Sequence, residues 1–395
     1  MDFSFTPEQD ELRRQMKEFA KTDIPPEWTG GGYAEEYGTD EGWEVAKKVS
    51  RKLAQRGWLT MAWPREFGGM AATKTQYLVY REEMAYNIIP GGDMGVGGVS
   101  WIGQSLILFG TEEQKKKHLP GIASGEVYWC TGYSEPEAGT DLAALKTRAV
   151  RKGDEYIVNG QKVWTSAAHR ADWCWLGVRT DPDAPRHKGI SVLLVDMKTP
   201  GVTVNPLLNL AGNLENSEVF YDDVHVPAEN LVGQENDGWR VIMTALSFER
   251  TAGIDFLGRN KRLLDEVIEY CKTTKRNGKL LSEDPVIRNK IAEFAIECEL
   301  GRLMCYNIAA MEDQGQIPGY EASATKNFTA EMGQRLAQFA VNVEGLYGQV
   351  ESGPRALLRG MAQTVYMFSV GDTIGAGTSE VNRMVIATRG LGLPR

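Results

Sequence analysis

Apolar positions along the chain follow two different periods, and the period changes twice. Over the first third, Leu12, Met16 and Phe19 recur at the three- and four-residue spacing of an amphipathic helix. Just before them, the run TPEQ from Thr6 to Gln9 has the form of a capping box with proline at the first helical position. The pattern therefore predicts a helix-rich segment that extends to about Pro120.

The middle of the chain instead has short β-prone runs separated by Pro and Gly about every ten residues. The run YIVNGQKVW (156–164) places two such segments around an Asn-Gly pair, which predicts a β-hairpin. The runs GISVLLVDM (189–197) and VFYDDVHVP (219–227) also predict strands. Short strands at this spacing indicate a β-barrel or a sandwich.

From about Trp239 the helical period returns. The segments RNKRLLDEVIEYCKTT and DPVIRNKIAEFAIECELGRLMCYNIAAME are apolar on one stripe and charged on the other, as in the antiparallel helices of a bundle. The α, β, α order predicts an α+β multi-domain protein. We expect an N-terminal helical domain over 1–125, a β domain over 126–236 and a helical bundle over 237–395.

Composition narrows the function classes. The chain has 395 residues and a formal net charge of -9, which disfavours nucleic acid as a partner because phosphate binding needs a basic face. No apolar run is long enough for a transmembrane helix, and the first residues lack the order of a signal peptide. Five scattered cysteines without a C-x-x-C pair predict reduced thiols in a cytoplasmic protein. None of the four histidines has the i, i+4 partner of a helical metal site, so no metal is expected.

Common nucleotide-binding and hydrolase motifs do not fit. The run GVGGVS (95–100) approaches a dinucleotide fingerprint, but it ends in serine and no strand precedes it. Neither a P-loop nor a G-x-S-x-G elbow occurs in the sequence. Nicotinamide-Rossmann, P-loop and serine-hydrolase classes are therefore poor interpretations.

Five longer motifs together resemble those of the acyl-CoA dehydrogenase family: CTGYSEPEAGTDL (130–142), NGQKVWTSAAHRADW (159–173), GAGTSEVNR (375–383), LFGTEEQKKKHLP (108–120) and RVIMTALSFERTAG (240–253). The resemblance covers nearly the whole chain. It implies a helical domain, a middle β-barrel and a C-terminal four-helix bundle, with FAD between the last two domains and a neighbouring subunit. It also implies α,β-dehydrogenation of an acyl-CoA thioester: a carboxylate takes the α-proton, flavin N5 takes the β-hydride, and electrons pass to electron-transfer flavoprotein.

The resemblance also assigns site residues. Without it, a capped turn at 134–137 and a buried aromatic at Trp164 would be the simpler interpretations. Thr140, Arg250 and Gly375 are assigned to the substrate. Contacts to the cofactor are assigned to Thr131, Tyr133, Ser134, Gly139, Thr140, Trp164, Thr165, Ser166, Asn342, Gly345, Thr378 and Glu380.

The catalytic base is expected away from the C-terminal loop. Many family members carry a glutamate just before the Gly-Thr of this loop, where the chain has Ala376. Others place the base in the first long helix of the bundle, and the matching motif SFERTAG contains Glu249. We therefore predict Glu249 as the base and the Ala376 N–H as a donor to the thioester oxygen. A mutual helix salt bridge of Glu249 with Arg250 is the alternative, although adjacent helical residues do not face each other. Glu380 is expected to bind flavin or face solvent.

The chain departs from the family where a neighbouring subunit usually clamps the FAD adenylate. An R-x-x-F-G stretch reads TKRNG, with Thr274 and Asn277 at the Arg and Phe positions, and a Gln-x-x-Gly-Gly stretch keeps only Asn342 and Gly345. A homotetramer or a heterotetramer is expected. The small residues at Gly375 and Ala376 favour branched, cyclic or aryl-bearing acyl groups. Two alternatives remain: a non-catalytic or partner-dependent subunit of a heteromeric enzyme, and a relative that oxidises a non-thioester substrate.

Overall fold

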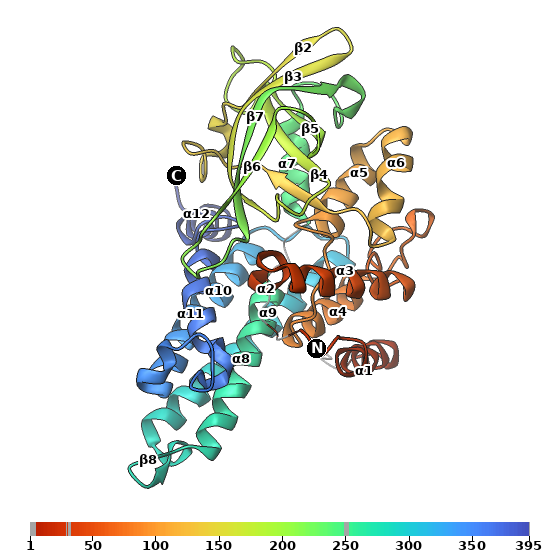
Figure 1. Cartoon of the computed structure of the whole chain (residues 1–395). Helices are drawn as coiled ribbons and strands as arrows, with labels where there is room; N and C mark the ends of the chain where they lie inside the picture. The colour runs from red at the N-terminus through yellow and green to blue at the C-terminus, as the bar shows by residue number, and fades with distance from the viewer. Residues whose placement is uncertain (1–4, 29, 31–32, 249–252, 395) are drawn as a thin grey trace. The chain divides into compact units, whose positions relative to one another are not determined.

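The computed structural model describes residues 5–28, 30, 33–248 and 253–394, and the chain divides into two compact units. The first, here called the bundle unit, comprises Met1–Ile24, Thr73–Ile89 and Arg250–Arg395. The second, the sheet unit, comprises Pro25–Ala72 and Pro90–Glu249. The helices that the first third of the sequence predicts are thus shared between the two units (Figure 1).

The bundle unit contains the four long helices expected of the C-terminal segment. In Figure 1, α8, α10 and α11 run alongside one another, and they pack on a common apolar core with α9. That core includes the buried side chains of Leu264, Phe294 and Leu336. The helices of this unit are α1 (Pro7–Thr22), α4 (Lys74–Tyr86), α8 (Gly253–Thr273), α9 (Pro285–Asp313), α10 (Tyr320–Glu344), α11 (Met361–Asp372) and α12 (Ser379–Val385).

The capping box read from the sequence begins the first helix as predicted. The Thr6 hydroxyl accepts a hydrogen bond from the Gln9 N–H at 3.3 Å, and the Gln9 side chain accepts one from the Thr6 N–H at 3.0 Å. The predicted capping box is therefore confirmed. Helix α9 begins in a related way, because the Asp284 carboxylate accepts the N–H of Val286 at 2.8 Å and Pro285 occupies the first helical position.

In the sheet unit, one seven-stranded sheet carries the apolar core, in the order β1-β4-β2-β3-β7-β6 with β5 paired to β4 (Figure 1). Its strands are β1 (Trp129–Gly132), β2 (Arg148–Lys152), β3 (Glu155–Ser166), β4 (Trp173–Arg179), β5 (Ile190–Asp196), β6 (Val202–Leu207) and β7 (Asn216–Pro227). Its helices are α2 (Tyr33–Gly38), α3 (Asp40–Gln55), α5 (Gln104–Phe109), α6 (Glu112–Ala123) and α7 (Gly238–Ser247). The strands predicted at 189–197 and 219–227 are β5 and β7.

The hairpin predicted at Asn159-Gly160 is wrong. Residues 155–166 form one continuous strand, β3, and the Asn-Gly pair lies at an irregularity in its pairing with β7. There the Asn159 side chain bonds both the N–H and the carboxylate of Asp223, at 3.0 and 2.9 Å. A Cβ on Gly160 would lie 2.7 Å from the Thr147 Cα, so glycine is needed for close strand approach and not for a turn. Tertiary packing therefore overrides the local turn signal.

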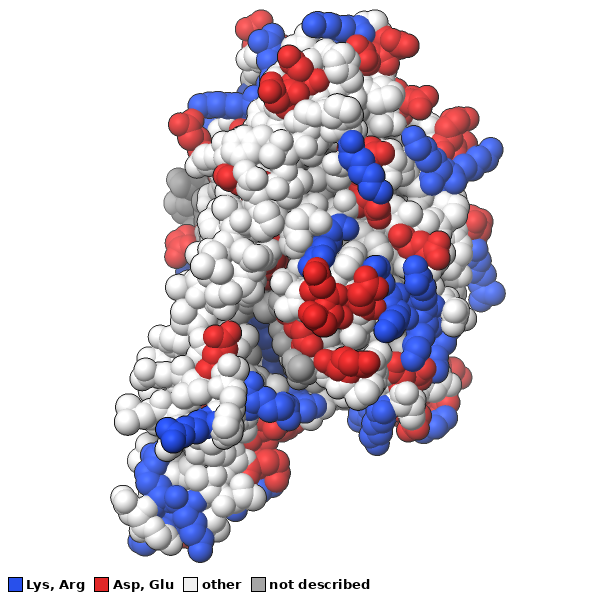
Figure 2. All heavy atoms as spheres, viewed as in Figure 1, with Lys and Arg blue, Asp and Glu red and all other residues white. Residues whose placement is uncertain are grey.

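All five cysteines are buried and free. Within the described ranges, no helix combines the length and the apolar character needed to cross a bilayer. The charged side chains of the face drawn in Figure 2 include both acidic and basic groups, often next to one another.

Candidate active site

The end of strand β1 is the first part of the site in the sheet unit. Thr131 lies on β1, and the chain then turns through Tyr133 and Ser134. The Trp175 indole N–H donates to the Tyr133 hydroxyl at 2.8 Å, and the Val163 N–H donates to the Ser134 carbonyl at 2.9 Å. Strands β3 and β4 therefore hold this segment in one orientation.

A buried ion pair between Lys162 and Glu135 also stabilises this segment. The Lys162 side chain is fully buried, and its Nζ lies 2.8 Å from Glu135 Oε1 and 3.0 Å from the Tyr133 carbonyl oxygen. The Glu135 carboxylate also accepts the backbone N–H groups of Lys146 and Thr147, at 2.6 and 2.8 Å. Burial alone would raise the pKa of Glu135, but the Lys162 charge and these donors hold that pKa below its usual value. Burial lowers the pKa of the Lys162 ammonium, and the Glu135 charge opposes that shift. The pair ties three segments together.

Trp164 is turned outward by a break in the sheet. The β3–β7 pairing shifts register between Lys162 and Thr165, and Trp164 takes a left-handed φ of 59°. Its side chain is 60% exposed, so the buried-aromatic interpretation is wrong. The neighbouring Thr165 is buried, and its hydroxyl has no hydrogen-bond partner within the described part of the chain. The Ser166 hydroxyl accepts a hydrogen bond from Asn216 at 2.8 Å.

The segment after Ser134 forms the turn that the residues alone suggested, although no hydrogen bond from the Ser134 hydroxyl caps it within the described residues. The backbone groups of Glu135 and Ala138 bond each other at 3.0 and 3.1 Å. Gly139 follows, and a Cβ built there would meet no heavy atom within 4 Å. Thr140 is exposed. The turn therefore leaves open backbone beside a hydroxyl, which suits close approach of a ligand.

In the bundle unit, the site residues lie on the loop before α12. Ala376 and Gly377 both have left-handed φ values, 52° and 88°. The Gly377 carbonyl accepts the Lys326 ammonium at 2.7 Å and the Asn382 amide at 2.9 Å, so the loop is anchored from α10 and α12. The Thr378 hydroxyl caps α12 by accepting the Val381 N–H at 3.2 Å.

The anchored loop presents a free backbone donor. The Gly375 N–H bonds the Gly371 carbonyl at 2.9 Å, whereas no acceptor among the described residues lies at the Ala376 N–H. Ala376 carries only a methyl group, and Ile374 beside it is 61% exposed. This loop supplies a hydrogen-bond donor but no proton acceptor from residue 376.

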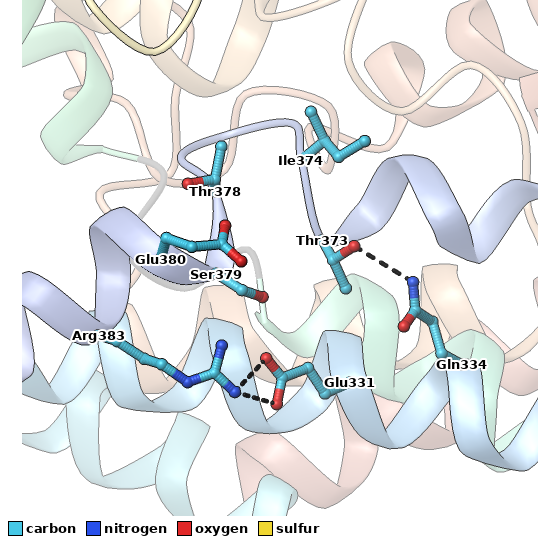
Figure 3. Close-up of a pocket in the computed structure, with 8 residues that line it drawn as sticks. All are labelled: Glu331, Gln334, Thr373, Ile374, Thr378, Ser379, Glu380 and Arg383. Carbon is cyan, nitrogen blue, oxygen red and sulfur yellow. Dashed lines mark hydrogen bonds and ion pairs between the residues drawn. The ribbon is translucent and has the colours of Figure 1, made fainter.

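A pocket of about 290 Å³ lies behind this loop, within the bundle unit (Figure 3). Arg383 pairs with Glu331 across it at 2.7 Å, and Gln334 donates to the Thr373 hydroxyl at 3.2 Å. The Ser379 hydroxyl is buried and has no hydrogen-bond partner within the residues described. The pocket is lined by Glu331, Gln334, Thr373, Ile374, Thr378, Ser379, Glu380 and Arg383.

Six of these lining residues were not identified by sequence reasoning; of the eight, only Thr378 and Glu380 were. Glu331 and Gln334 stand one helical turn apart on α10, but many other positions of this helix are also polar, so the two do not stand out in the sequence. The sequence also does not reveal that Arg383, from another helix, pairs with Glu331.

The structure brings together the two segments that depart from the family pattern. Asn277 and Gly278, with φ of 53° and 82°, form the turn of a hairpin between β8 (Lys275–Arg276) and β9 (Lys279–Leu280). From that hairpin, the Arg276 guanidinium donates to the Val343 carbonyl at 2.5 Å. Residues 274–278 therefore meet the end of α10, just before Gly345.

A buried carboxyl group lies at this junction. The Glu344 side chain is 5% exposed, and its Oε1 has no hydrogen-bond partner within the described ranges. Burial raises the pKa of Glu344 to about 7. Next to it, Gly345 has a left-handed φ of 67°, Leu346 is 86% exposed and Asn342 is exposed. The junction therefore holds both a buried carboxyl and the Arg276 guanidinium, where the family pattern has phosphate-binding groups.

The predicted base is not among the described residues. Glu249 and Arg250 both lie outside them. Helix α7 ends at Ser247 and α8 begins at Gly253.

Taken one unit at a time, these features suit a planar, phosphate-bearing cofactor. The sheet unit offers an exposed indole at Trp164, an unpaired hydroxyl at Thr165 and open backbone at Gly139. The bundle unit offers the free Ala376 N–H and the Ser379 hydroxyl. Such donors favour a group that gains negative charge on reduction, as a flavin does. The fold and these donors are compatible with a flavoprotein oxidoreductase.

Comparison with known proteins identifies the family. The N-terminal, middle and C-terminal domains of acyl-CoA dehydrogenase match residues 6–126, 130–224 and 236–391. Acyl-CoA dehydrogenase FadE26 of Mycobacterium tuberculosis is 36% identical over 100% of this chain and 99% of its own length. The chain therefore belongs to the acyl-CoA dehydrogenase family, whose members are FAD-dependent, and it is an acyl-CoA dehydrogenase.

Solved structures agree on the fold. The structure titled Tcur3481-Tcur3483 steroid ACAD matches with a TM-score of 0.91 and 33% identity, and each chain is covered completely. A chain of the ChsE4-ChsE5 complex from Mycobacterium tuberculosis matches with a TM-score of 0.90 and 35% identity, again over both full lengths. The predicted fold class is confirmed, with the middle domain a β half-barrel.

Proposed function

We propose that this chain dehydrogenates the α,β bond of a branched, cyclic or aryl-bearing acyl-CoA, with Glu249 as the base. The observation that carries the proposal is the loop at Ala376, which keeps an unpaired N–H but has a methyl group where many relatives have the catalytic carboxylate. The N–H does not depend on the side chain, so thioester activation survives the substitution. Proton abstraction then requires another carboxylate, and SFERTAG supplies Glu249.

The residues divide the chemistry between them. The Ala376 N–H donates to the thioester oxygen and so acidifies the α C–H. The Glu249 carboxylate accepts the α-proton, and Arg250, Gly375 and Thr140 shape the substrate site. FAD, when bound, supplies the two-electron acceptor for the hydride leaving Cβ, and electron-transfer flavoprotein takes those electrons onward.

Cofactor binding is assigned to both units. In the sheet unit, the braced Thr131–Ser134 segment and Trp164 to Ser166 hold the ring, while Gly139 and Thr140 stay open for phosphate and substrate. In the bundle unit, Thr378 and Glu380 line the pocket of Figure 3, and Asn342 and Gly345 complete the set.

A wide acyl site is supported by the small residues at 375 and 376. A neighbouring structure is titled a steroid ACAD, which supports the cyclic end of the proposed substrate range. A panel of CoA thioesters tests this directly by bleaching of the bound flavin. Fast turnover of butanoyl- or octanoyl-CoA, with cyclic and aryl thioesters inert, would reject the proposed range.

The base is tested with Glu249→Gln. We expect kcat for flavin bleaching to fall by about 10²–10⁴-fold, because general-base catalysis contributes that much. Flavin content should stay the same, which separates lost chemistry from lost cofactor. Bleaching at the wild-type rate in this variant would show that Glu249 is not the base.

A second candidate, a subunit that depends on a different partner chain, is favoured by the junction at Glu344. Thr274 and Asn277 replace the clamp residues, and a buried carboxyl and Leu346 stand beside Gly345. One structural neighbour is the ChsE4-ChsE5 complex, which contains two kinds of chain. To test this candidate, the chain is expressed alone, and its FAD content and the mass of the assembly that it forms are measured. A yellow homotetramer with one FAD per chain would exclude this candidate.

A further inference from the structure

A buried lysine on α10 has no assigned role in the chemistry above. Lys326 is 7% exposed, and its ammonium donates to the Gly377 carbonyl at 2.7 Å. Within the described residues, this carbonyl is the one hydrogen-bond acceptor of the ammonium, and no carboxylate there pairs with it directly. Burying a charged group against a single neutral acceptor is costly, so packing alone does not account for a lysine at this position.

Neutral side chains already hold both ends of the loop at Ala376. Where the loop begins, Gln334 donates to the Thr373 hydroxyl at 3.2 Å (Figure 3), and where it ends, the Asn382 amide donates to the Gly377 carbonyl at 2.9 Å. The Lys326 ammonium thus binds a carbonyl that already has a donor. It adds a positive charge and a hydrogen bond that is stronger than one from an amide, because the donor is ionised.

The carbonyl that Lys326 binds belongs to the strained part of the loop. Ala376 and Gly377 have left-handed φ values of 52° and 88°, and this region is unfavourable for alanine. A residue stays in such a conformation only where its surroundings fix it. By restraining the next carbonyl along the chain, the Lys326 ammonium opposes relaxation of Ala376 to the right-handed region, which would turn the loop around the Ala376 N–H.

Three carboxylates offset part of the cost of this buried charge. Burial lowers the pKa of the Lys326 ammonium, and the charges of Asp372, Glu331 and Glu380 oppose that shift. Asp372 directly precedes the loop, is itself buried, and forms an ion pair with Arg259 of α8. The carboxylates surround the lysine, while its direct hydrogen bond is kept for the loop.

We propose that Lys326 is a positioning residue of the reaction: through the Gly377 carbonyl, its ammonium holds the loop so that the Ala376 N–H meets the thioester oxygen. The inference rests on the proposed function and adds a residue to it. The thioester oxygen gains negative charge as the α-proton leaves, and the buried positive charge beside the loop favours that change. Glu249 still accepts the proton, so Lys326 alters the rate of the transfer and not its destination.

The first test replaces the lysine in the FAD-loaded full chain, with the acyl-CoA that wild type oxidises fastest as substrate. Lys326→Met keeps the length of the side chain but removes the charge and the donor. Its kcat per bound flavin should fall about tenfold to a hundredfold with KM little changed, because a misplaced donor costs that much. Lys326→Arg keeps the charge and the donors and should recover most of the loss, whereas the uncharged Lys326→Gln should not.

The matched control is Arg335→Met. It removes a cation from the same helix, but one that pairs with Glu297 of α9 at 3.0 Å and makes no contact with the loop among the hydrogen bonds of the described residues. Its kcat per bound flavin should equal that of wild type. If Lys326→Met fails to fold or to load FAD, Lys326→Gln takes its place in every measurement.

A 3-oxoacyl-CoA gives a readout that a merely structural role would not move. Its α C–H is acidic, and its enolate absorbs in the near ultraviolet, so the ratio of enolate to keto form on the enzyme reports the donors at the thioester oxygen. At a fixed pH, this ratio should fall about tenfold in Lys326→Met and stay unchanged in Arg335→Met.

A folded, FAD-loaded Lys326→Met or Lys326→Gln with the wild-type kcat and enolate ratio would overturn the proposal. A loss of activity that follows FAD content alone, with kcat per flavin unchanged, would overturn it as well. The two levels of inference fail separately. If wild type oxidises no thioester, the proposed function is wrong; if wild type is active and Lys326→Met matches it, only the role of Lys326 is wrong.

Discussion

The two units hold their site residues in different ways. In the sheet unit, the segment from Thr131 to Glu135 is fixed by a buried ion pair, an indole donor and backbone bonds from β3. In the bundle unit, the loop at Ala376 is held largely through its backbone groups, among them the carbonyls of Gly377 and Thr378. At the junction, Oε1 of the buried Glu344 has no hydrogen-bond partner within the described residues. The residues that hold this segment of the sheet unit therefore tolerate few substitutions. In the bundle unit, several residues already differ from the family pattern.

This difference matches the departures from the family pattern. The motifs at 130–142 and 159–173 carry the resemblance in the sheet unit, and the altered positions Thr274, Asn277 and Ala376 all belong to the bundle unit. A braced segment tolerates few substitutions, because each buried polar group depends on the others. A loop that works through its backbone N–H tolerates side-chain change.

The largest effect is expected when the buried Lys162–Glu135 ion pair of the sheet unit is broken. Lys162→Met leaves the Glu135 carboxylate buried without its counter-charge, which should lower the free energy of unfolding by about 3–5 kcal/mol. Chemical denaturation measures this. The double variant Glu135→Gln/Lys162→Met should recover much of the loss, and the exposed control Lys152→Met should change stability by less than about 0.5 kcal/mol. An equal loss in the single and double variants would mean that the ion pair is not the cause.

At the junction in the bundle unit, removing a buried charge should raise the free energy of unfolding instead of lowering it. Because the pKa of Glu344 is raised to about 7, the folded state holds a proton that the unfolded state releases above its ordinary pKa of 4.5. The contribution of the Glu344 carboxyl to the free energy of unfolding is fully present below pH 4.5 and is lost as the pH rises through 7. Glu344→Gln should therefore be more stable than wild type at pH 8, by up to roughly 3 kcal/mol, with no difference near pH 4.5.

The measurement is the unfolding free energy of both proteins across pH 4.5–8. Glu36, whose pKa burial also raises to about 7, is present in both and cancels in the difference. A stability difference between the two proteins that does not change with pH would show that the raised pKa of Glu344 is not its cause.

The tolerance of the loop can be tested by restoring the missing side chain. In the Glu249→Gln background, Ala376→Glu should raise the rate of flavin bleaching about tenfold, because the proposed function requires that a carboxylate at either position reach the α-carbon. Ala376→Gln in the same background has the same size but accepts no proton, and should give no gain. Equal rates with Glu and Gln would show that the loop position no longer faces the substrate.

The smallest effect on stability is expected at Gly139. Because a Cβ there meets no heavy atom within 4 Å, Gly139→Ala should change the unfolding free energy by less than about 0.5 kcal/mol. FAD affinity should nevertheless fall about tenfold if a ligand fills that space. Fluorescence titration of the apoprotein with FAD measures it, and an unchanged Kd would remove Gly139 from the site.

Periodicity and capping signals predicted the helices, the order of the domains and two of the long strands. They failed at Asn159-Gly160, where contacts with Thr147 and Asp223 decide the conformation and neither is local in sequence. Motifs likewise located Trp164 but not its exposure, which follows from a register shift in the sheet. The partnership of Lys162 with Glu135 and the burial of Glu344 arise only when distant segments meet.

The Lys162–Glu135 pair also constrains how related sequences can diverge. Loss of either member alone leaves a charge in the core, so a lineage that abandons the pair must change both positions nearly together. Across relatives, position 135 should therefore covary with position 162, and chains with only one member of the pair should be rare. The shape of the turn at Tyr133 to Glu135 then depends on two residues that must be inherited together, even though neither residue is assigned to the reaction.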